Sequence, residues 1–304
     1  MSAATGNPEG SGAAVHVPVL MREVLAQLHL GPGLRVVDGT VGAGGHSRRI
    51  LERIGETGEL IGLDRDPYML RFAASRLSAS NSHLVQASYA ELRQVLNELH
   101  VERVDRILLD LGLSSDQLAD AGRGFGFQAG GPLDLRFDTS RGEPAWQWLE
   151  HIDAATLADI IEEYGEDPFS RRIAEHLVQR QRTRPIRTAA DLTEAVEEAL
   201  PQHVRATARK QPATRVFQAL RIAVNQELEQ LDRFLGDVAD DCLEPGGRVV
   251  IISFHSLEDR RVKQALRETT RWQNLTPKPV TATASEQRAN PRSRTAKLRA
   301  ARKL

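Results

Sequence analysis

The stretch VVDGTVGAGGHS, residues 36–47, decides the fold of this chain. Two β-branched apolar residues run into Asp38, glycines and small residues follow, and the helix-like segment SRRILERI (47–54) comes directly after them. A strand, a glycine-rich turn and a helix in this order are typical of a site for a nucleotide-like ligand. The stretch therefore predicts a ligand site inside an α/β fold.

The chain around this turn alternates short apolar strands with amphipathic helices. Four strands are expected, at 34–40, 59–65, 83–88 and 104–112. Three helices are expected between them, at 45–55, 66–77 and 89–99. Such alternation is typical of a parallel sheet that is covered by helices on both faces. The predicted fold class is α/β, with a doubly wound, Rossmann-like sheet.

The alternation is interrupted after residue 113. Residues 114–140 are rich in glycine and predict a loop, and residues 145–210 show helical patterns without a strand-like segment. We therefore predict an inserted, mostly helical domain at 114–213. The α/β domain would then consist of 16–113 and 214–304.

The α/β pattern resumes near the C-terminus. The expected elements are a long helix at 213–240, a strand at 248–254, a helix from Ser256 onward, and weaker strands at 278–283 and 296–301. The last of these alternates in character, which favours an antiparallel edge strand. The glycine-bearing residues 1–15 predict a disordered tail, because they lack the basic start and apolar stretch of a signal peptide.

The composition indicates a soluble globular protein. Hydrophobic residues make up 40% of the chain and charged residues 27%, and no apolar run approaches the roughly 20 residues that a membrane span needs. The single cysteine, Cys242, excludes an internal disulfide, and we interpret it as a small buried apolar residue in a cytoplasmic protein without a membrane partner.

The formal net charge of −1 by itself gives no reason to expect a nucleic acid. Basic residues nevertheless concentrate at 171–187, with six arginines against Glu175, and at 288–304, which contains no acid. Such clusters either follow a phosphate backbone or form a solvated face.

The glycine-rich turn excludes two familiar ligands. A P-loop for a triphosphate needs a lysine where Gly45 stands. A dinucleotide turn needs a third glycine where Ser47 stands, and Asp38 would repel a pyrophosphate.

S-adenosylmethionine has the opposite preference, because it carries a sulfonium and an ammonium and has no phosphate. Asp38 would lie near these positive groups, and the N–H groups from Gly44 to His46 would bind the carboxylate of the donor. Asp64, at the end of the second strand, would accept hydrogen bonds from both ribose hydroxyls. The turn therefore favours a methyl donor.

The fourth strand ends in ILLDLGLSSDQL, which places Asp110 where amino-group methyltransferases hold the target NH2. Those enzymes follow this acid or amide with two prolines and an aromatic residue, whereas here Leu111 and Gly112 follow. The acid fits an amino methyltransferase, and the rest of the motif makes one that acts on DNA a poor match.

Several blocks of sequence together resemble the bacterial 16S ribosomal RNA cytosine-N4 methyltransferase family. They occur in family order from about residue 16 onward: HVPVL, DGTVGAGGHS, LDRDP, ILLDLGLSSDQL, RGFGF, GPLDLRFD, YGEDPFSRRIA, PATRVFQALRIAVNQEL and PGGRVVIISFHSLEDRRVK. The resemblance implies a class I methyltransferase fold with a helical insert. It also implies S-adenosylmethionine as the donor, and N4 of a decoding-centre (P-site) cytosine in 16S ribosomal RNA of the small subunit as the acceptor.

The resemblance also implies the site residues. The donor-binding set is Gly44, Gly45, His46, Asp64, Tyr89, Asp110 and Gln117. Asp110 is the candidate catalytic residue, and it binds either the ammonium of the donor or the N4 hydrogens. For His46 we favour a backbone contact over a side-chain role; Tyr89 could instead pack, and Gln117, like Ser114, could instead cap the loop.

Other residues near the predicted crevice have less certain roles. His255 and Ser253 would border it, where they could bind RNA, relay a proton or serve the structure. The histidines show no metal-ligand spacing, and no metal is expected. The arginines of the insert are the natural surface for RNA. Phe125 and Phe127 could stack on a base, although pinning of the loop to the core is favoured.

Two other classes of function remain open from the residues alone. One is a methyltransferase that acts on a small molecule or a protein, and the other is a nucleic-acid-binding module without catalysis. The oligomeric state, monomer or homodimer, also remains open.

Overall fold

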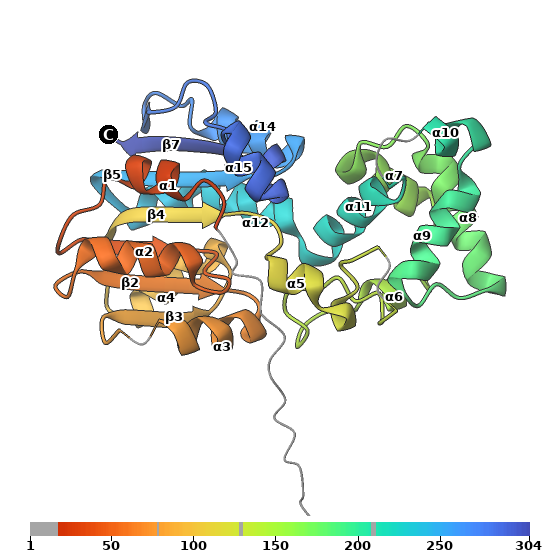
Figure 1. Ribbon diagram of the computed structural model, residues 1–304, viewed down its shortest axis with the longest axis horizontal. Helices are drawn as coiled ribbons and strands as arrows, with labels where there is room; N and C mark the ends of the chain where they lie inside the picture. Colours follow the sequence, from red (N-terminus) through yellow and green to blue (C-terminus); the bar gives the residue numbers. More distant parts are fainter. Residues whose placement is uncertain (1–17, 78, 128–129, 208–210) are drawn as a thin grey trace, which may run out of the picture.

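The computed structural model describes residues 18–77, 79–127, 130–207 and 211–304, and the predicted tail at 1–15 lies outside these ranges. Two lobes lie side by side (Figure 1). One contains the sheet and the helices that cover it, and the other consists of helices and loops from the middle of the chain. Within the described ranges no helix combines the length and the apolar character that a membrane span requires.

The sheet has seven strands in the order β3-β2-β1-β4-β5-β7-β6. Their bounds are β1 Arg35–Asp38, β2 Glu59–Asp64, β3 Ser82–Gln86, β4 Val104–Asp110, β5 Leu243–Ser253, β6 Trp272–Asn274 and β7 Lys297–Lys303. The first five strands pair in parallel, and β7 is antiparallel to both neighbours. This confirms the doubly wound α/β sheet of the class I methyltransferase fold. The strand order reverses between β1 and β4, where such sheets bind ligands.

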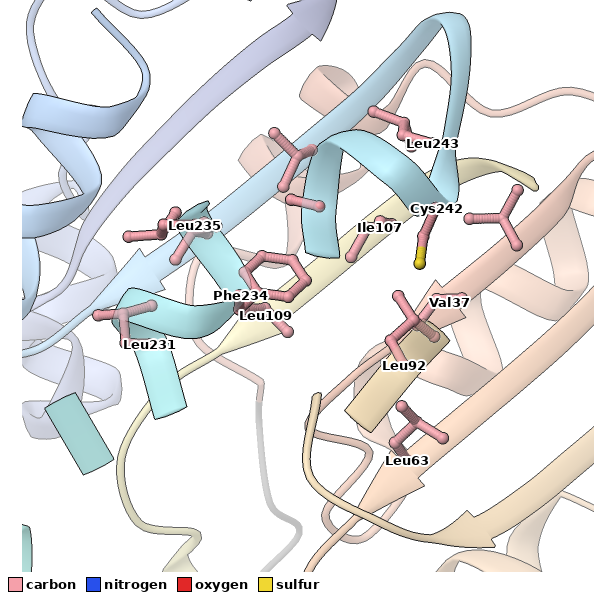
Figure 2. Packing of buried hydrophobic residues seen from close by; sticks show 14 of the residues in the cluster. Val37, Leu63, Leu92, Ile107, Leu109, Leu231, Phe234, Leu235, Cys242 and Leu243 are labelled. Atoms are coloured by element: carbon pink, nitrogen blue, oxygen red, sulfur yellow. The ribbon is translucent and has the colours of Figure 1, made fainter. Parts of the chain in front are cut away.

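Helices cover both faces of the sheet. Their bounds are α1 Met21–Leu28, α2 Gly45–Ile54, α3 Pro67–Arg76, α4 Leu92–Glu98, α12 Glu227–Arg233, α13 Ala239–Cys242, α14 Ser256–Ala265 and α15 Ala284–Ala289. Successive residues of a strand point to opposite faces, so Val36 packs with α1 and α2 whereas Val37 packs with α4 and α12. Figure 2 shows the cluster that contains Val37, to which Phe234, Leu109 and the buried thiol of Cys242 also belong.

The C-terminal strands differ from the prediction. The segment at 278–283 is not a strand; Val280 forms only an isolated bridge to Leu298. The predicted edge strand is antiparallel, as expected, but β6 pairs outside it and forms the edge. Three residues are too few to show an alternating pattern, and the burial of Trp272 is what fixes β6 on the sheet.

The helical lobe contains a short first helix and then a bundle. The bounds are α5 Ser115–Ala119, α6 Ala145–Trp148, α7 Ala154–Gly165, α8 Ser170–Thr183, α9 Ala189–Ala199, α10 Gln202–Thr207 and α11 Thr214–Asn225. The helix predicted at 213–240 is not continuous, because Gln226 adopts a left-handed conformation with φ of 51°. Asn225 fixes this break: its side chain donates to Leu135 O at 2.7 Å and accepts from Phe137 N at 2.7 Å.

Helix α11 packs in the core of the helical lobe. Val216, Phe217 and Leu220 share a cluster with Leu157 of α7 and Leu192 of α9. We therefore propose that the insert ends at Gln226 and includes α11, whereas the sequence pattern placed its end at 213.

Candidate functional site

A pocket lies at the carboxyl ends of β1, β2 and β4, beside the point where the strand order reverses. Six of the predicted site residues contribute to its lining: Gly45, His46, Asp64, Tyr89, Asp110 and Gln117. Gly44 does not; it directly precedes α2, and its φ of +81° lets the chain turn from β1 into that helix. At Gly45 a Cβ atom would lie 2.5 Å from Pro18 Cγ, and this close approach requires glycine.

Asp38 has a different place from the one that its sequence position suggested. It is buried but does not line the pocket, and its carboxylate accepts from Ser47 Oγ at 2.6 Å and Thr40 N at 3.2 Å. Burial raises the pKa of this carboxyl. Asp38 therefore braces the glycine-rich turn, and its charge acts on the pocket only from a distance.

Asp64 ties the second strand to the turn. One carboxylate oxygen accepts from Gly42 N at 2.8 Å and the other from Asp66 N at 2.9 Å. Each oxygen retains a lone pair for a further hydrogen bond. Burial raises the pKa of Asp64 to about 6. The residue is thus held in place as an acceptor, and it is ionised at neutral pH.

His46 and Asp110 are neighbours in the lining of the pocket. The distance from His46 Nε2 to Asp110 Oδ2 is 3.5 Å, and the imidazole is 6% exposed. Among the described residues, neither ring nitrogen has a hydrogen-bond partner, and neither does the buried Oδ1 of Asp110. Thr40 Oγ1 accepts from Asp110 N at 2.6 Å and fixes the end of β4. Because buried polar atoms normally have partners, these atoms indicate a ligand site.

The side chains of Tyr89 and Gln117 have structural partners as well as pocket positions. Tyr89 stacks edge-on against Phe234, with ring centroids 5.6 Å apart, and burial raises the pKa of its hydroxyl. Gln117 forms a capping box with Ser114 and donates to Asp66 Oδ2 at 2.9 Å. The amide of Gln117 therefore links α5 to the start of α3 at the edge of the pocket.

Sequence reasoning missed pocket residues that come from distant parts of the chain. Arg292, in the turn Pro291–Thr295, lines the pocket and donates to Ser115 Oγ at 2.6 Å. Burial lowers the pKa of its guanidinium. Phe254, Glu258 and Glu227 also line the pocket. The motif HSLED contained Glu258, but no local signal separates Arg292 from the other arginines of its basic segment.

A buried charge cluster closes one side of the pocket. Arg221 donates to both carboxylate oxygens of Glu227, at 2.8 and 3.0 Å, and His255 Nε2 lies 3.1 Å from Glu258 Oε1. Burial opposes ionisation of Glu258, but His255 and the N–H of Phe254 outweigh it and lower the pKa. His255 does not itself line the pocket, and neither does Ser253, which donates to Lys297 O at 3.3 Å.

Among the described residues, Glu227, His255 and Glu258 form the group that could hold a metal ion, since one ligand atom from each lies within 4.8 Å of the others. The fork of Arg221 already occupies both oxygens of Glu227, however, and its positive charge disfavours a cation there. We interpret this group as an ion-pair cluster that joins α11 to α12 and α14.

Three of the six arginines at 171–187 form ion pairs with glutamates of the same lobe. Arg180 is buried and lies 2.8 Å from Glu194 and 2.5 Å from Glu198, and Arg184 lies 2.7 Å from Glu194. Arg187 pairs with Glu150. The acids lie in α9 and in the turn after α6, outside the basic run, so the sequence window overestimated the free positive charge.

The basic C-terminal segment and the two phenylalanines also have structural roles. Arg299 and Lys297 pair with Asp259 at 2.6 and 3.1 Å. Phe125 lies 6.0 Å from Phe137 and Phe127 lies 5.1 Å from Phe217, measured between ring centroids. The favoured interpretation, that these rings pin the loop to the core, is confirmed.

A second cavity lies between the lobes. Four arginines contribute to its lining: Arg65, Arg136, Arg141 and Arg233. Arg65 lines both cavities, so the two are neighbours. Arg136 is held by Asp134, and Arg141 lies 3.6 Å from Asp138 although its side chain is 80% exposed; Arg233 is exposed as well. Asp138 and Glu91 also line the cavity, but the four arginines outnumber these two acids.

Comparison with known proteins places the chain among methylases. The profile of a family described as the MraW methylase family matches residues 13–304. Ribosomal RNA small subunit methyltransferase H of Nitratidesulfovibrio vulgaris (strain Miyazaki F) is 47% identical, over 99% of this chain and 90% of the relative. The protein of the same name from Sorangium cellulosum is 48% identical, over 95% and 91%. A solved rRNA methylase from Streptococcus thermophilus aligns with a TM-score of 0.40 at 12% identity, over 96% and 99%.

Proposed function

This chain belongs to the MraW methylase family, and on that premise we propose that it methylates the N4 amine of a decoding-centre (P-site) cytosine in 16S ribosomal RNA. The methyl donor is S-adenosylmethionine. The relatives that match nearly the whole chain are named as methyltransferases of small-subunit ribosomal RNA, which supports the substrate class. The acid at the end of β4, where amino methyltransferases hold the target NH2, supports the amine as acceptor.

The residues of the pocket fit the donor. S-adenosylmethionine supplies an electrophilic methyl group on a positively charged sulfur. Asp64 would accept from the ribose, and the N–H groups at the start of α2 would bind the carboxylate. Tyr89 would lie beside the adenine, with Gln117 at the edge of the same pocket. The carboxylates of Asp110 and Asp38 favour a cationic ligand over a phosphate.

One observation carries the catalytic assignment. Asp110 lies at the switch point of the sheet with Oδ1 buried and without a partner, and Thr40 fixes its backbone. A carboxylate oxygen in this state accepts an N4 hydrogen, orients the amine and favours loss of its proton. We therefore assign Asp110 to the target amine, whereas the sequence left the ammonium of the donor as an equal choice.

The second cavity is the proposed path of the RNA backbone. Its exposed arginines, Arg141 and Arg233, lie in different lobes and beside the donor pocket, so a phosphate between them would bridge the lobes. We expect the protein in the cytoplasm, where small subunits assemble.

The test offers tritiated S-adenosylmethionine to the purified protein with four acceptors: small subunits that lack the modification, free 16S RNA, DNA and ribosomal protein. We expect label only in the two samples that contain 16S RNA. Label in protein or DNA would contradict the substrate class, and label in none of the four would favour a small-molecule methyltransferase or a binding module.

A further inference from the structure

His46 and His255 are two histidines whose buried ring nitrogens lack a hydrogen-bond partner among the described residues, and of the two only His46 lines the donor pocket. Its ring is 6% exposed and lines the donor pocket, yet neither nitrogen has a hydrogen-bond partner among the described residues. Asp110 Oδ2 is 3.5 Å from Nε2, and Asp110 Oδ1 also lacks a partner. A structural histidine in a core normally satisfies both nitrogens. The arrangement is that of a pair that can exchange a proton with what enters the pocket.

Resting on the proposed function, we propose that His46 and Asp110 form one proton-accepting pair, which loses a proton when the cationic donor binds and takes up the proton that N4 loses on methylation. Asp110 touches the amine and is the catalytic residue. His46 acts through Asp110 and is a positioning residue, because its charge decides whether the carboxylate is free to accept.

The balance of charge explains why a pair is needed. On transfer the N4–methyl bond forms while the sulfur–methyl bond breaks, and the electron pair of the broken bond stays on sulfur as a neutral thioether. The N4 atom, cationic after it gains the methyl group, releases one proton. A positive charge therefore leaves the sulfur and reappears as this proton. If the pair holds the proton, the net charge of the buried site does not change.

The charges around His46 support this exchange. Burial opposes the imidazolium, but the carboxylates of Asp110 and Asp38 outweigh it and raise the pKa of His46, so the free pair holds a proton more readily than an isolated histidine. A cationic donor lowers that pKa again. The other charged groups of the pocket lining come from β2, the segment after it, α12, α14 and the C-terminal turn: Asp64, Arg65, Glu227, Glu258 and Arg292. Arg76 of α3 donates to Ala43 O at 3.4 Å, just before α2.

The test counts the protons released on ligand binding, by calorimetry in two buffers of different protonation enthalpy. S-adenosylmethionine and S-adenosylhomocysteine are compared without RNA at about pH 7.5, where Asp64, with a pKa of about 6, is ionised throughout. Wild-type protein should release more protons with the sulfonium ligand than with the thioether, by roughly half a proton or more. His46→Gln should remove the difference.

His83→Gln is the matched control, because His83 also pairs with a carboxylate, Glu59 at 3.2 Å, but lies outside the pocket. This variant should keep the wild-type difference. The proposal is overturned if both ligands release equal protons from wild-type protein, or if the difference survives in His46→Gln. If neither ligand binds wild-type protein, the proposed function fails first and this proposal falls with it.

A second readout is the pH dependence of single-turnover methylation, measured with saturating donor so that protonation of Asp64 and its effect on donor affinity do not contribute. The wild-type rate should fall toward acid pH as the pair retains its proton, whereas His46→Gln should be slower and should lose that dependence. An unchanged acid limb in His46→Gln would assign the titration to another group and contradict the proposal.

Discussion

The donor pocket and the helical lobe both concentrate charged side chains, but the partners of these side chains differ. In the pocket, the buried ring of His46 and the buried Oδ1 of Asp110 have no hydrogen-bond partner among the described residues. In the helical lobe, Arg180 is equally buried, but two glutamates pair with it. Unsatisfied buried groups cost stability and are retained where a ligand completes them, whereas paired groups hold helices together. A buried atom without a partner indicates a site where it also lines a pocket, as in His46 and Asp110; Arg93 Nε and Arg180 Nε lack partners too, but neither residue lines either cavity.

The largest expected effect is at Asp110. Asp110→Ala should lower methyl transfer to small-subunit RNA by about 10³-fold or more, because the amine loses its acceptor. The free energy of unfolding should change little, since Oδ1 has no partner among the described residues and the contact of Oδ2 with His46 is long, at 3.5 Å. Turnover with tritiated donor and urea unfolding measure the two quantities. Retention of near wild-type turnover would show that Asp110 has another role.

The next effect concerns Asp64 and has a defined pH dependence. The pKa of this carboxyl is raised to about 6, so it becomes protonated and loses acceptor strength as the pH falls below that value. Donor affinity should weaken from pH 7 toward pH 5, and Asp64→Asn should bind about 10- to 100-fold more weakly with this dependence reduced. Calorimetric titration across this range measures both, and an Asp64→Asn variant with wild-type affinity would exclude the ribose contact.

The proposed RNA path predicts that exposed arginines of the second cavity contribute more to RNA affinity than exposed arginines of the basic run at 171–187. The double variant Arg141→Ala/Arg233→Ala should bind RNA about tenfold more weakly, and the slope of log affinity against log salt should decrease by about 2. Arg171→Ala/Arg182→Ala removes the same charge from exposed positions of the helical lobe and should change affinity by less than about twofold. If Arg171→Ala/Arg182→Ala weakened RNA binding more than Arg141→Ala/Arg233→Ala, the RNA-binding surface would instead be the arginine-rich run of the insert.

The smallest effect on activity is expected at Arg180, although it matters for stability. Arg180→Ala removes a buried cation with two glutamate partners and should cost about 2 kcal/mol of unfolding free energy. Methyl transfer at a temperature where the variant is folded should stay within about twofold of wild type. A large loss of RNA affinity in this folded variant would mean that Arg180 leaves its ion pairs to bind phosphate.

Much of the α/β lobe could be predicted because its signals are local. Periodicity indicates each strand from β1 to β4, and parallel strands bring their carboxyl ends to one edge, so Asp64 and Asp110 had to meet there. The glycine-rich turn likewise indicated the kind of ligand. The interpretation of Asp38 was wrong in one respect, because the pattern cannot show that Ser47 occupies its carboxylate.

The rest depends on tertiary contacts that leave no local trace. Arg292 reaches the pocket from a turn far along the chain, and Glu194 meets Arg180 only because α8 and α9 pack together. The helix break at Gln226 could not be predicted, because no glycine or proline stands there. The side chain of Asn225 stabilises the break through hydrogen bonds to a loop that is distant in the sequence. These features required the fold before they could be recognised.

The most direct test of the central claim is the position of the methyl group on the RNA. Small subunits without the modification are methylated by the purified protein, the RNA is digested to nucleosides, and the product is identified by mass spectrometry against authentic standards. The account predicts N4-methylcytidine from a single decoding-centre position, absent with Asp110→Ala. A methyl group on C5 of cytosine, on a ribose hydroxyl or on another base would contradict it.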